Sequence, residues 1–239
     1  MDAGRPDTNY VDRGADVHLR SPAQMREYEA IVERVAASGC RTVLDWGAGW
    51  GQISHMLIGR GLEVSSLEYV AEGKVDERAE ALPPGVEITY TDDPVALPYP
   101  DGAFDAALSV GVLEHVSRPE ESLRELHRVL RPGGTLWVFK LPNERSYLEW
   151  IARRAGLYYH GHYPDDRLYS PAGARALIGA HGFEVREARY ANMLPLSLPG
   201  RAARALGPVI WALSRAMARI PLLNRLATNV DVVAVTRRR

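Results

Sequence analysis

Short apolar runs alternate along this chain with segments in which apolar residues recur every three or four positions. The runs predict buried strands, and the periodic segments predict helices that pack against them. This alternation is typical of an α/β fold with a doubly wound, mostly parallel sheet and helices on both faces. The expected strands are 42–46, 63–68, 86–91, 104–110, 134–140, 183–190 and 230–236, and the expected helices are 21–38, 51–60, 71–81, 118–130, 143–155 and 170–182.

Several of the expected helices begin with capping signals. The sequence Ser21-Pro22-Ala23-Gln24 combines a capping serine, a proline in the first turn and a glutamine that could close a capping box. Residues 117–120, Ser-Arg-Pro-Glu, repeat this arrangement. Asn143 is the expected cap of the helix that follows it.

Residues 191–229 separate the last two expected strands and form a basic insertion. Pro208 and Pro221 bracket an expected short helix in it. The apolar face of that helix would comprise Ile210, Leu213, Met217 and Ile220. The insertion has five arginines, at positions 201, 204, 215, 219 and 225, and no acidic residue. Two interpretations stay open: the helix caps the sheet with its arginines solvated or ion-paired, or the arginines contact anionic lipid heads or a phosphate-bearing substrate.

We divide the chain into four segments on this basis. Residues 1–39 are an N-terminal segment and helix that could close as a lid, residues 40–190 are the core, residues 191–229 are the basic insertion or helical cap, and residues 230–239 are the final strand and tail.

Composition narrows the class of protein. A chain of 239 residues can bury one good core, and its formal net charge of −1 argues against a nucleic-acid partner. The single cysteine, Cys40, excludes an internal disulfide and fits a reducing compartment. The polar N-terminus predicts no signal peptide, and no stretch approaches the ~20 apolar residues that span a bilayer. We therefore expect a cytoplasmic protein, peripheral to the membrane if the insertion binds lipid.

The most informative motif is the run from Val43 to Gly51, Val-Leu-Asp-Trp-Gly-Ala-Gly-Trp-Gly. An apolar strand ends in an aspartate, and three glycines follow at alternate positions before a helix. Because glycine has no Cβ, the backbone can turn sharply there and let a ligand approach. An acidic residue, Glu68, ends the next expected strand about 20 residues later. This layout predicts a nucleoside-containing cofactor whose ribose hydroxyls bind the carboxylate.

This run resembles the first motif of the class I S-adenosylmethionine (SAM)-dependent methyltransferases. Four later segments are similar to the same family, in the family's order. Residues 98–105 resemble its LPFPDGSFD stretch, 112–116 its LEHV motif, 130–136 its LKPGG turn and 181–185 its AGF turn. The resemblance covers residues 40–190. It implies a Rossmann-like seven-stranded sheet with an antiparallel last strand, SAM as cofactor and S-adenosylhomocysteine (SAH) as product.

The resemblance also implies which residues bind the cofactor. Gly47, Ala48 and Gly49 would pass under the methionine moiety, and Asp45 would orient this loop or the cofactor's ammonium group. Glu68 would accept hydrogen bonds from the ribose, and Tyr69 would cover the adenine.

Two further contacts follow from the family's motifs. Val110, at the end of the fourth strand, would border the methionine moiety. Asp93 would accept a hydrogen bond from the adenine amino group, but the next residue, Pro94, has no N–H to donate to the ring. Either Asp92 takes this role or the contact is lost.

Three histidines are candidate catalytic residues. His115 lies just past the fourth strand, at the edge where open α/β sheets bind ligands, and could act as a general base. The alternative is that its ring only holds a loop. His160 and His162, in the tyrosine-rich segment 158–164, would contact the substrate unless that loop is simply solvated. A His-x-His pair alone is weak support for a metal site, and we expect none.

The predicted function is SAM-dependent methyl transfer to a small molecule, with an oxygen nucleophile favoured. A lipid, a quinone or a lipid-linked sugar would fit if the insertion contacts lipid. Residues 109–112, Ser-Val-Gly-Val, differ from the Asn/Asp-Pro-Pro-Tyr-like run of methyltransferases that act on nucleobase or glutamine amino groups. The alternatives are an NAD(P)-dependent Rossmann oxidoreductase, whose third loop glycine would fall on Gln52, and a non-catalytic SAM-binding scaffold.

Overall fold

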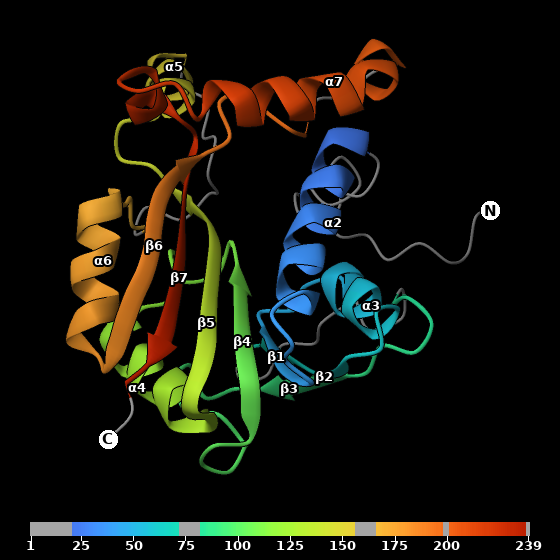
Figure 1. Ribbon diagram of the computed structural model, residues 1–239, viewed down its shortest axis with the longest axis vertical. Coiled ribbons are helices and arrows are strands. Elements are labelled where there is room, and N and C mark those ends of the chain that lie inside the picture. The colour runs from blue at the N-terminus through green and yellow to red at the C-terminus, as the bar shows by residue number, and fades with distance from the viewer. Residues whose placement is uncertain (1–20, 72–81, 156–165, 198–200, 238–239) are drawn as a thin grey trace.

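A seven-stranded sheet forms the centre of the molecule, with the strand order β3-β2-β1-β4-β5-β7-β6. The computed structural model describes residues 21–71, 82–155, 166–197 and 201–237. The strands are β1 (Thr42–Trp46), β2 (Glu63–Tyr69), β3 (Ile88–Thr91), β4 (Phe104–Val110), β5 (Leu130–Pro142), β6 (Phe183–Ala191) and β7 (Asn229–Thr236). Strands β1 to β5 pair in parallel, and β7 lies antiparallel between β5 and β6 (Figure 1). The predicted fold class is confirmed.

Helices cover both faces of this sheet (Figure 1). On one face, α2 (Pro22–Ala36) and α3 (Gln52–Ile58) bury apolar side chains against β1, β4 and β5. On the other face, α4 (Pro119–Val129) and α6 (Pro171–Ala180) do the same. Because side chains alternate along a strand, Val233 of β7 packs with the first set and its neighbours Val232 and Ala234 with the second. The helix expected at 71–81 lies outside the described residues.

Two further helices lie at the end of the sheet where β4 finishes (Figure 1). They are α5 (Tyr147–Arg154) and α7 (Arg201–Met217), which lies across the top of the view. Trp211 Nε1 of α7 donates to Glu27 Oε2 of α2 over 2.7 Å, so the insertion is attached to α2 by a buried carboxylate. None of the described helices is long and apolar enough to span a bilayer.

The helix of the basic insertion differs from its prediction in two ways. It begins at Arg201, so Pro208 lies inside it rather than at its start. Its predicted apolar face is only partly buried: Leu213 and, beyond the helix, Ile220 are about half exposed, Ile210 and Met217 are partly buried, and Gly207 and Ser214 are buried. One reason is close packing at Gly207, where an added Cβ would lie 2.7 Å from Pro22 Cβ of α2. Ser214 Oγ also accepts hydrogen bonds from two backbone amides, those of Met193 and Leu194.

The predicted capping boxes do not form. Ser21 Oγ donates to the Leu196 carbonyl, and Gln24 accepts from Lys140, so tertiary partners take both side chains. The first helical residue of α4 is Pro119, and no side chain caps this helix. At α5 the cap is Ser146.

The expected cap of α5, Asn143, has another role. Its amide group donates to the carbonyls of Arg225 and Ala227, over 2.9 and 2.7 Å, and so ties the end of β5 to the chain before β7. Strand β5 also begins earlier than predicted, at Leu130. Leu130 pairs with Phe104 of β4, and the pairing resumes at Thr135 with Ala106, so residues 131–134 form an irregularity within the strand.

Two helical glycines give a test of how α7 sits on α2. A Cβ added at Gly207 would lie 2.7 Å from Pro22 Cβ and 2.9 Å from the Ala23 nitrogen, whereas one added at Gly179 of α6 would meet nothing within 4 Å. We expect Gly207→Ala to lower the free energy of unfolding by about 1–3 kcal/mol, because the site is overpacked. Gly179→Ala, the matched control, should raise it by up to about 1 kcal/mol. Urea titration followed by circular dichroism measures both, and an equal response of the two variants would contradict this packing.

Candidate functional site

The glycine-rich loop after β1 adopts a backbone that only glycine accepts easily. Gly47 has a φ of 80°, and a Cβ added there would lie 2.3 Å from Val112 Cγ2. The amides of Gly47 and Ala48 both donate to the Leu67 carbonyl, over 2.8 and 3.0 Å. The loop is therefore held between the ends of β2 and β4, with its backbone pressed against a side chain.

Glu68 lies directly at this loop. The Gly49 amide donates to Glu68 Oε2 over 2.7 Å, which joins the loop to the end of β2. Tyr69 follows, with 49% of its surface exposed. The structure therefore brings together the loop, the predicted ribose carboxylate and the predicted adenine-covering ring.

Asp45 lies beneath the loop rather than on its open side. Its side chain is 2% exposed and accepts a hydrogen bond of 2.5 Å from Ser54 Oγ of α3, which in turn accepts one of 2.8 Å from Ser66 Oγ of β2. Burial raises the pKa of Asp45 to about 6, and the nearby charge of Glu68 adds to this effect against the hydrogen bond from Ser54. Of its two predicted roles, this position favours orienting the loop.

Asp92 and Asp93 lie just after β3, which pairs with the end of β2. Both are exposed. Asp93 Oδ1 accepts hydrogen bonds from the amides of Val95 and Ala96, over 2.8 and 2.9 Å, and these bonds lower the pKa of Asp93. One oxygen of Asp93 is thus already engaged in the turn around Pro94. The assignment of the adenine contact to Asp93 or Asp92 stays a prediction.

The end of β4 completes this edge. Val110 is half-buried, and the next residue, Gly111, has a φ of 69° and donates its amide to the Phe139 carbonyl over 3.0 Å. Because β4 pairs with β1, this segment lies beside the glycine-rich loop. The carboxyl ends of β1, β2 and β4 therefore present the predicted cofactor residues side by side.

His115 is paired with a carboxylate that the sequence analysis did not identify. Its Nδ1 lies 2.7 Å from Asp166 Oδ1, and the Asp166 side chain is only 8% exposed. The two residues are 51 positions apart, and no local pattern announces their contact. His160 and His162 lie outside the described residues, so their contacts with substrate stay predictions.

A buried group of polar side chains next to His115 was also missed. Glu114 is 3% exposed, and burial raises its pKa to about 7, although His115 and Lys140 act in the opposite direction. Lys140 Nζ donates to Gln24 Oε1 over 2.8 Å, and burial lowers the pKa of this lysine. The sequence signal that could have identified this group is Lys140, the one charged residue in the apolar run 136–141.

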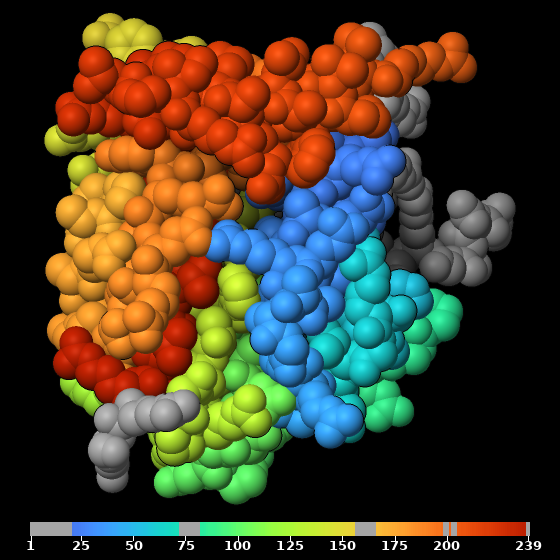
Figure 2. All heavy atoms as spheres, viewed as in Figure 1, coloured from blue at the N-terminus to red at the C-terminus, as the bar shows by residue number. Residues whose placement is uncertain are grey.

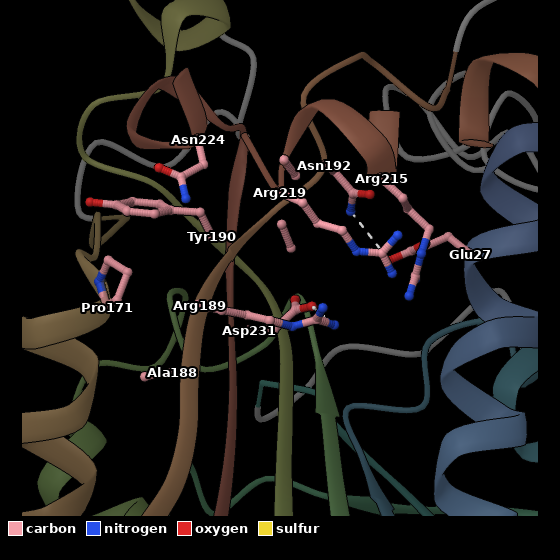
Figure 3. Close-up of a pocket in the computed structure, with 12 residues that line it drawn as sticks. Glu27, Pro171, Ala188, Arg189, Tyr190, Asn192, Arg215, Arg219, Asn224 and Asp231 are labelled. Carbon is pink, nitrogen blue, oxygen red and sulfur yellow. Dashed lines mark hydrogen bonds and ion pairs between the residues drawn. The ribbon is translucent and has the colours of Figure 1, made fainter. Parts of the chain in front are cut away.

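A hollow of about 390 Å³ lies below α7, between α2 and the ends of β6 and β7 (Figures 2 and 3). Two buried acids on its wall are ion-paired: Glu27 Oε2 lies 3.2 Å from Arg215 Nη1, and Asp231 Oδ2 lies 3.3 Å from Arg189 Nη2. None of the predicted site residues lines it. The backbone amide of Lys140 donates to Asp231 Oδ1, so the hollow adjoins the group around Lys140.

The buried carboxylate of Asp45 gives a pH-dependent prediction. An unfolded aspartate has a pKa near 3.9, so above pH 6 folding must bury a charge that the unfolded chain keeps in water. We expect Asp45→Asn to raise the free energy of unfolding at pH 8 by roughly 2–3 kcal/mol, at about 1.4 kcal/mol per pKa unit. The gain should shrink as the pH falls through 6 and vanish near pH 4.

Urea unfolding at pH 8, 6 and 4 measures this effect, with Asp92→Asn as the control for loss of one negative charge. A gain that does not depend on pH, or a loss of stability at pH 8, would count against a buried ionised Asp45.

Comparison with known proteins agrees with this geometry. Residues 44–138 match the family model described as methyltransferase domain. The demethylmenaquinone methyltransferase of Thermus thermophilus is 29% identical over 69% of this chain and 84% of that protein. The ubiquinone biosynthesis O-methyltransferase of Chromobacterium violaceum is 29% identical over 87% of this chain and 83% of that protein.

Solved structures resemble this fold as well. A SAM-dependent methyltransferase from Thermotoga maritima, described as a possible histamine N-methyltransferase, has a TM-score of 0.59 and 19% sequence identity over 95% of each chain. At that identity the likeness shows the fold alone. The methyltransferase domain spans the glycine-rich loop and the end of β4, which favours methyl transfer over the oxidoreductase alternative. Residues 44–138 therefore form a methyltransferase domain, and the chain is an enzyme with the fold of the class I SAM-dependent methyltransferases.

Proposed function

We propose that this enzyme binds SAM at the carboxyl ends of β1, β2 and β4 and directs its methyl group to an oxygen of a small molecule. The observation that carries the proposal is the bond between the Gly49 amide and Glu68, because it holds the glycine-rich loop beside a carboxylate. When bound, SAM supplies a methyl group that its sulfonium makes electrophilic.

The residues at this edge fit the cofactor. The glycine-rich loop leaves no space for a Cβ at Gly47, so backbone rather than side chains would line the methionine moiety. Glu68 would hold the ribose hydroxyls and Tyr69 would cover the adenine, while Asp45 fixes the loop from below through Ser54. Asp93 or Asp92 would meet the adenine amino group, and Val110 would border the methionine.

His115 is proposed as the general base. When Asp166 accepts the proton on Nδ1, the lone pair of the ring is on Nε2, which is the tautomer that proton abstraction requires. Asp166 would also orient the ring and stabilise its charged form. An oxygen nucleophile needs such a base, because a hydroxyl attacks a methyl group well only after it loses its proton.

The acceptor is proposed to be amphipathic and held at a membrane surface. Both relatives named above belong by name to quinone chemistry. Among the described residues, ten large hydrophobic side chains are conspicuously exposed, and eight of them follow or belong to α5 and α7: Trp150, Ile151, Leu206, Val209, Leu213, Ile220, Leu222 and Leu226. A soluble surface seldom gathers them in this way.

The charge of this surface supports an anionic bilayer as its partner. Arg153 and Arg154 of α5 and Arg201 and Arg225 of the insertion are exposed beside these apolar side chains. Arginine and exposed leucine on one helical surface are typical of helices that lie in the lipid headgroup region. The exposure of Leu206, Val209 and Leu213 on α7 is explained if they enter lipid.

The cofactor proposal is tested by calorimetric titration with SAH. The wild type should bind SAH with micromolar affinity, and Glu68→Ala and Asp45→Ala should abolish binding, because one loses the ribose contact and the other the loop's support. His115→Asn is the matched control and should keep the affinity, since it is proposed to meet the acceptor. No binding by the wild type, or equal binding by Glu68→Ala, would refute the assigned site.

The membrane proposal is tested by co-sedimentation with phosphatidylglycerol vesicles at low salt. The wild type should pellet with them and not with phosphatidylcholine vesicles, and added salt should release it. The double variant Leu206→Ser/Leu213→Ser should lose at least tenfold in affinity, whereas Tyr90→Ser, an exposed ring on β3, should not. Failure of the wild type to pellet would refute the membrane proposal and leave the cofactor proposal unaffected.

A further inference from the structure

Lys140 occupies an unusual position at the end of β5. Its φ is 64°, a left-handed conformation that is uncommon for a residue other than glycine, and the register between β5 and β7 shifts around it. Asp231 Oδ1 accepts from its amide, and Asn229 Nδ2 donates to its carbonyl, both over 3.3 Å. Such backbone strain persists where the surroundings hold it, and it is concentrated at functional sites.

The side chain of Lys140 is directed inward and held there. Its Nζ donates to Gln24 Oε1 over 2.8 Å and lies 5.6 Å from the centre of the Tyr28 ring. An ammonium group has three hydrogens, and Gln24 takes one of them. The lysine can therefore donate to a further oxygen.

Two neighbouring groups await hydrogen-bond partners. Gln24 Nε2 and Glu114 Oε2 are buried, their side chains being 1% and 3% exposed, and no hydrogen bond of regular geometry reaches either atom from the described residues, although Gln24 interacts with the Tyr28 hydroxyl. Buried polar atoms in folded proteins are nearly always paired. These two atoms can therefore each take a hydrogen bond from a polar molecule that enters beside the lysine.

This group lies next to the proposed cofactor site. Glu114 Oε1 lies 3.7 Å from the Cβ position of Gly111, which directly follows Val110 of β4. Two residues before Glu114, the side chain of Val112 contacts Gly47 of the glycine-rich loop. On the opposite side, the charge of Asp45 contributes to the raised pKa of Tyr28, the ring under Lys140.

Burial lowers the pKa of Lys140, and the negative charges around it favour its charged form. Three acids face it, Glu27, Asp231 and Glu114. Glu27 is paired with Arg215 and Asp231 with Arg189. Burial favours the neutral form of the third, Glu114, and raises its pKa to about 7. An anion that entered this group would thus meet an ammonium whose neighbouring acids are already compensated or protonated.

We propose that Lys140, held by Gln24, binds the ionised oxygen of the methyl acceptor, so that the enzyme takes acidic hydroxyl compounds of the phenol or enol type rather than amines. The O–H bond of the acceptor breaks, its electron pair stays on oxygen beside the ammonium, and its proton passes to His115. A neutral amine is a poor acceptor for the Lys140 and Gln24 donors, and an ammonium ion is repelled. This inference rests on the proposed function and names its substrate class.

The test uses 4-nitrophenol, whose phenolate absorbs visible light, added to the SAH-loaded full-length protein at pH 6. Wild type should raise the phenolate absorbance and bind the probe at least tenfold more tightly than 4-nitroaniline, its nitrogen analogue. Lys140→Met should weaken phenolate binding at least tenfold and abolish the absorbance change. Arg186→Met is the matched control, because it removes an exposed cation on β6 and should bind like the wild type.

A second pair of variants separates binding from misfolding. Gln24→Leu removes the residue that holds Lys140 and should weaken phenolate binding several-fold. Glu114→Gln keeps the size of the side chain and should weaken phenolate binding at pH 6 less than Lys140→Met does, because the glutamate is then largely protonated. Calorimetry with SAH reports for each variant whether the cofactor site is intact.

The outcomes distinguish this inference from the proposed function. If SAH binds but 4-nitrophenol binds no better than 4-nitroaniline, or no phenolate band appears, the role of Lys140 is wrong and the cofactor site stands. If Lys140→Met ionises the probe as the wild type does, the same conclusion follows. If the wild type does not bind SAH, the proposed function itself fails.

Discussion

The contact between Gly47 and Val112 is the constraint on which the rest of this site depends. It presses the loop after β1 against the chain after β4, with no room for even one added carbon atom. Hydrogen bonds to the end of β2 hold the same loop from the other side. Three neighbouring strands therefore end at one backbone surface, and Glu68, Val110 and Glu114 are positioned relative to that surface.

Buried charge is the second organising feature, and it connects the site to the cap. Glu27 of α2 accepts hydrogen bonds from Trp211 and Arg215 of α7. Asp231 of β7 accepts them from Arg189 and from the backbone amide of Lys140. Unpaired charges in such a position would be costly, so each element keeps its partner in place. The position of α7 is thus linked, through these acids, to the lysine that faces the proposed acceptor.

The orientation of α7 gives this arrangement a further consequence. Helix α7 buries Gly207 and Ser214 and exposes three large apolar side chains, those of Leu206, Val209 and Leu213. That exposure is unfavourable in water and favourable at a lipid surface. A membrane-bound acceptor would reach the group around Lys140 from the same end of the sheet. Membrane contact and acceptor binding at Lys140 are therefore compatible, and each is tested separately.

The sequence by itself determined the strand and helix order, the sheet class, the glycine-rich loop and Glu68. These depend on short-range patterns: apolar runs, alternating glycines and a carboxylate at a fixed spacing after a strand. Only the tertiary structure decided that Ser21 and Gln24 leave their capping roles, that Asp166 meets His115, that α7 exposes Leu206 and Leu213, and that Lys140 meets Gln24. Each of these is a contact between residues far apart in the chain, where burial and hydrogen bonding outweigh local preference.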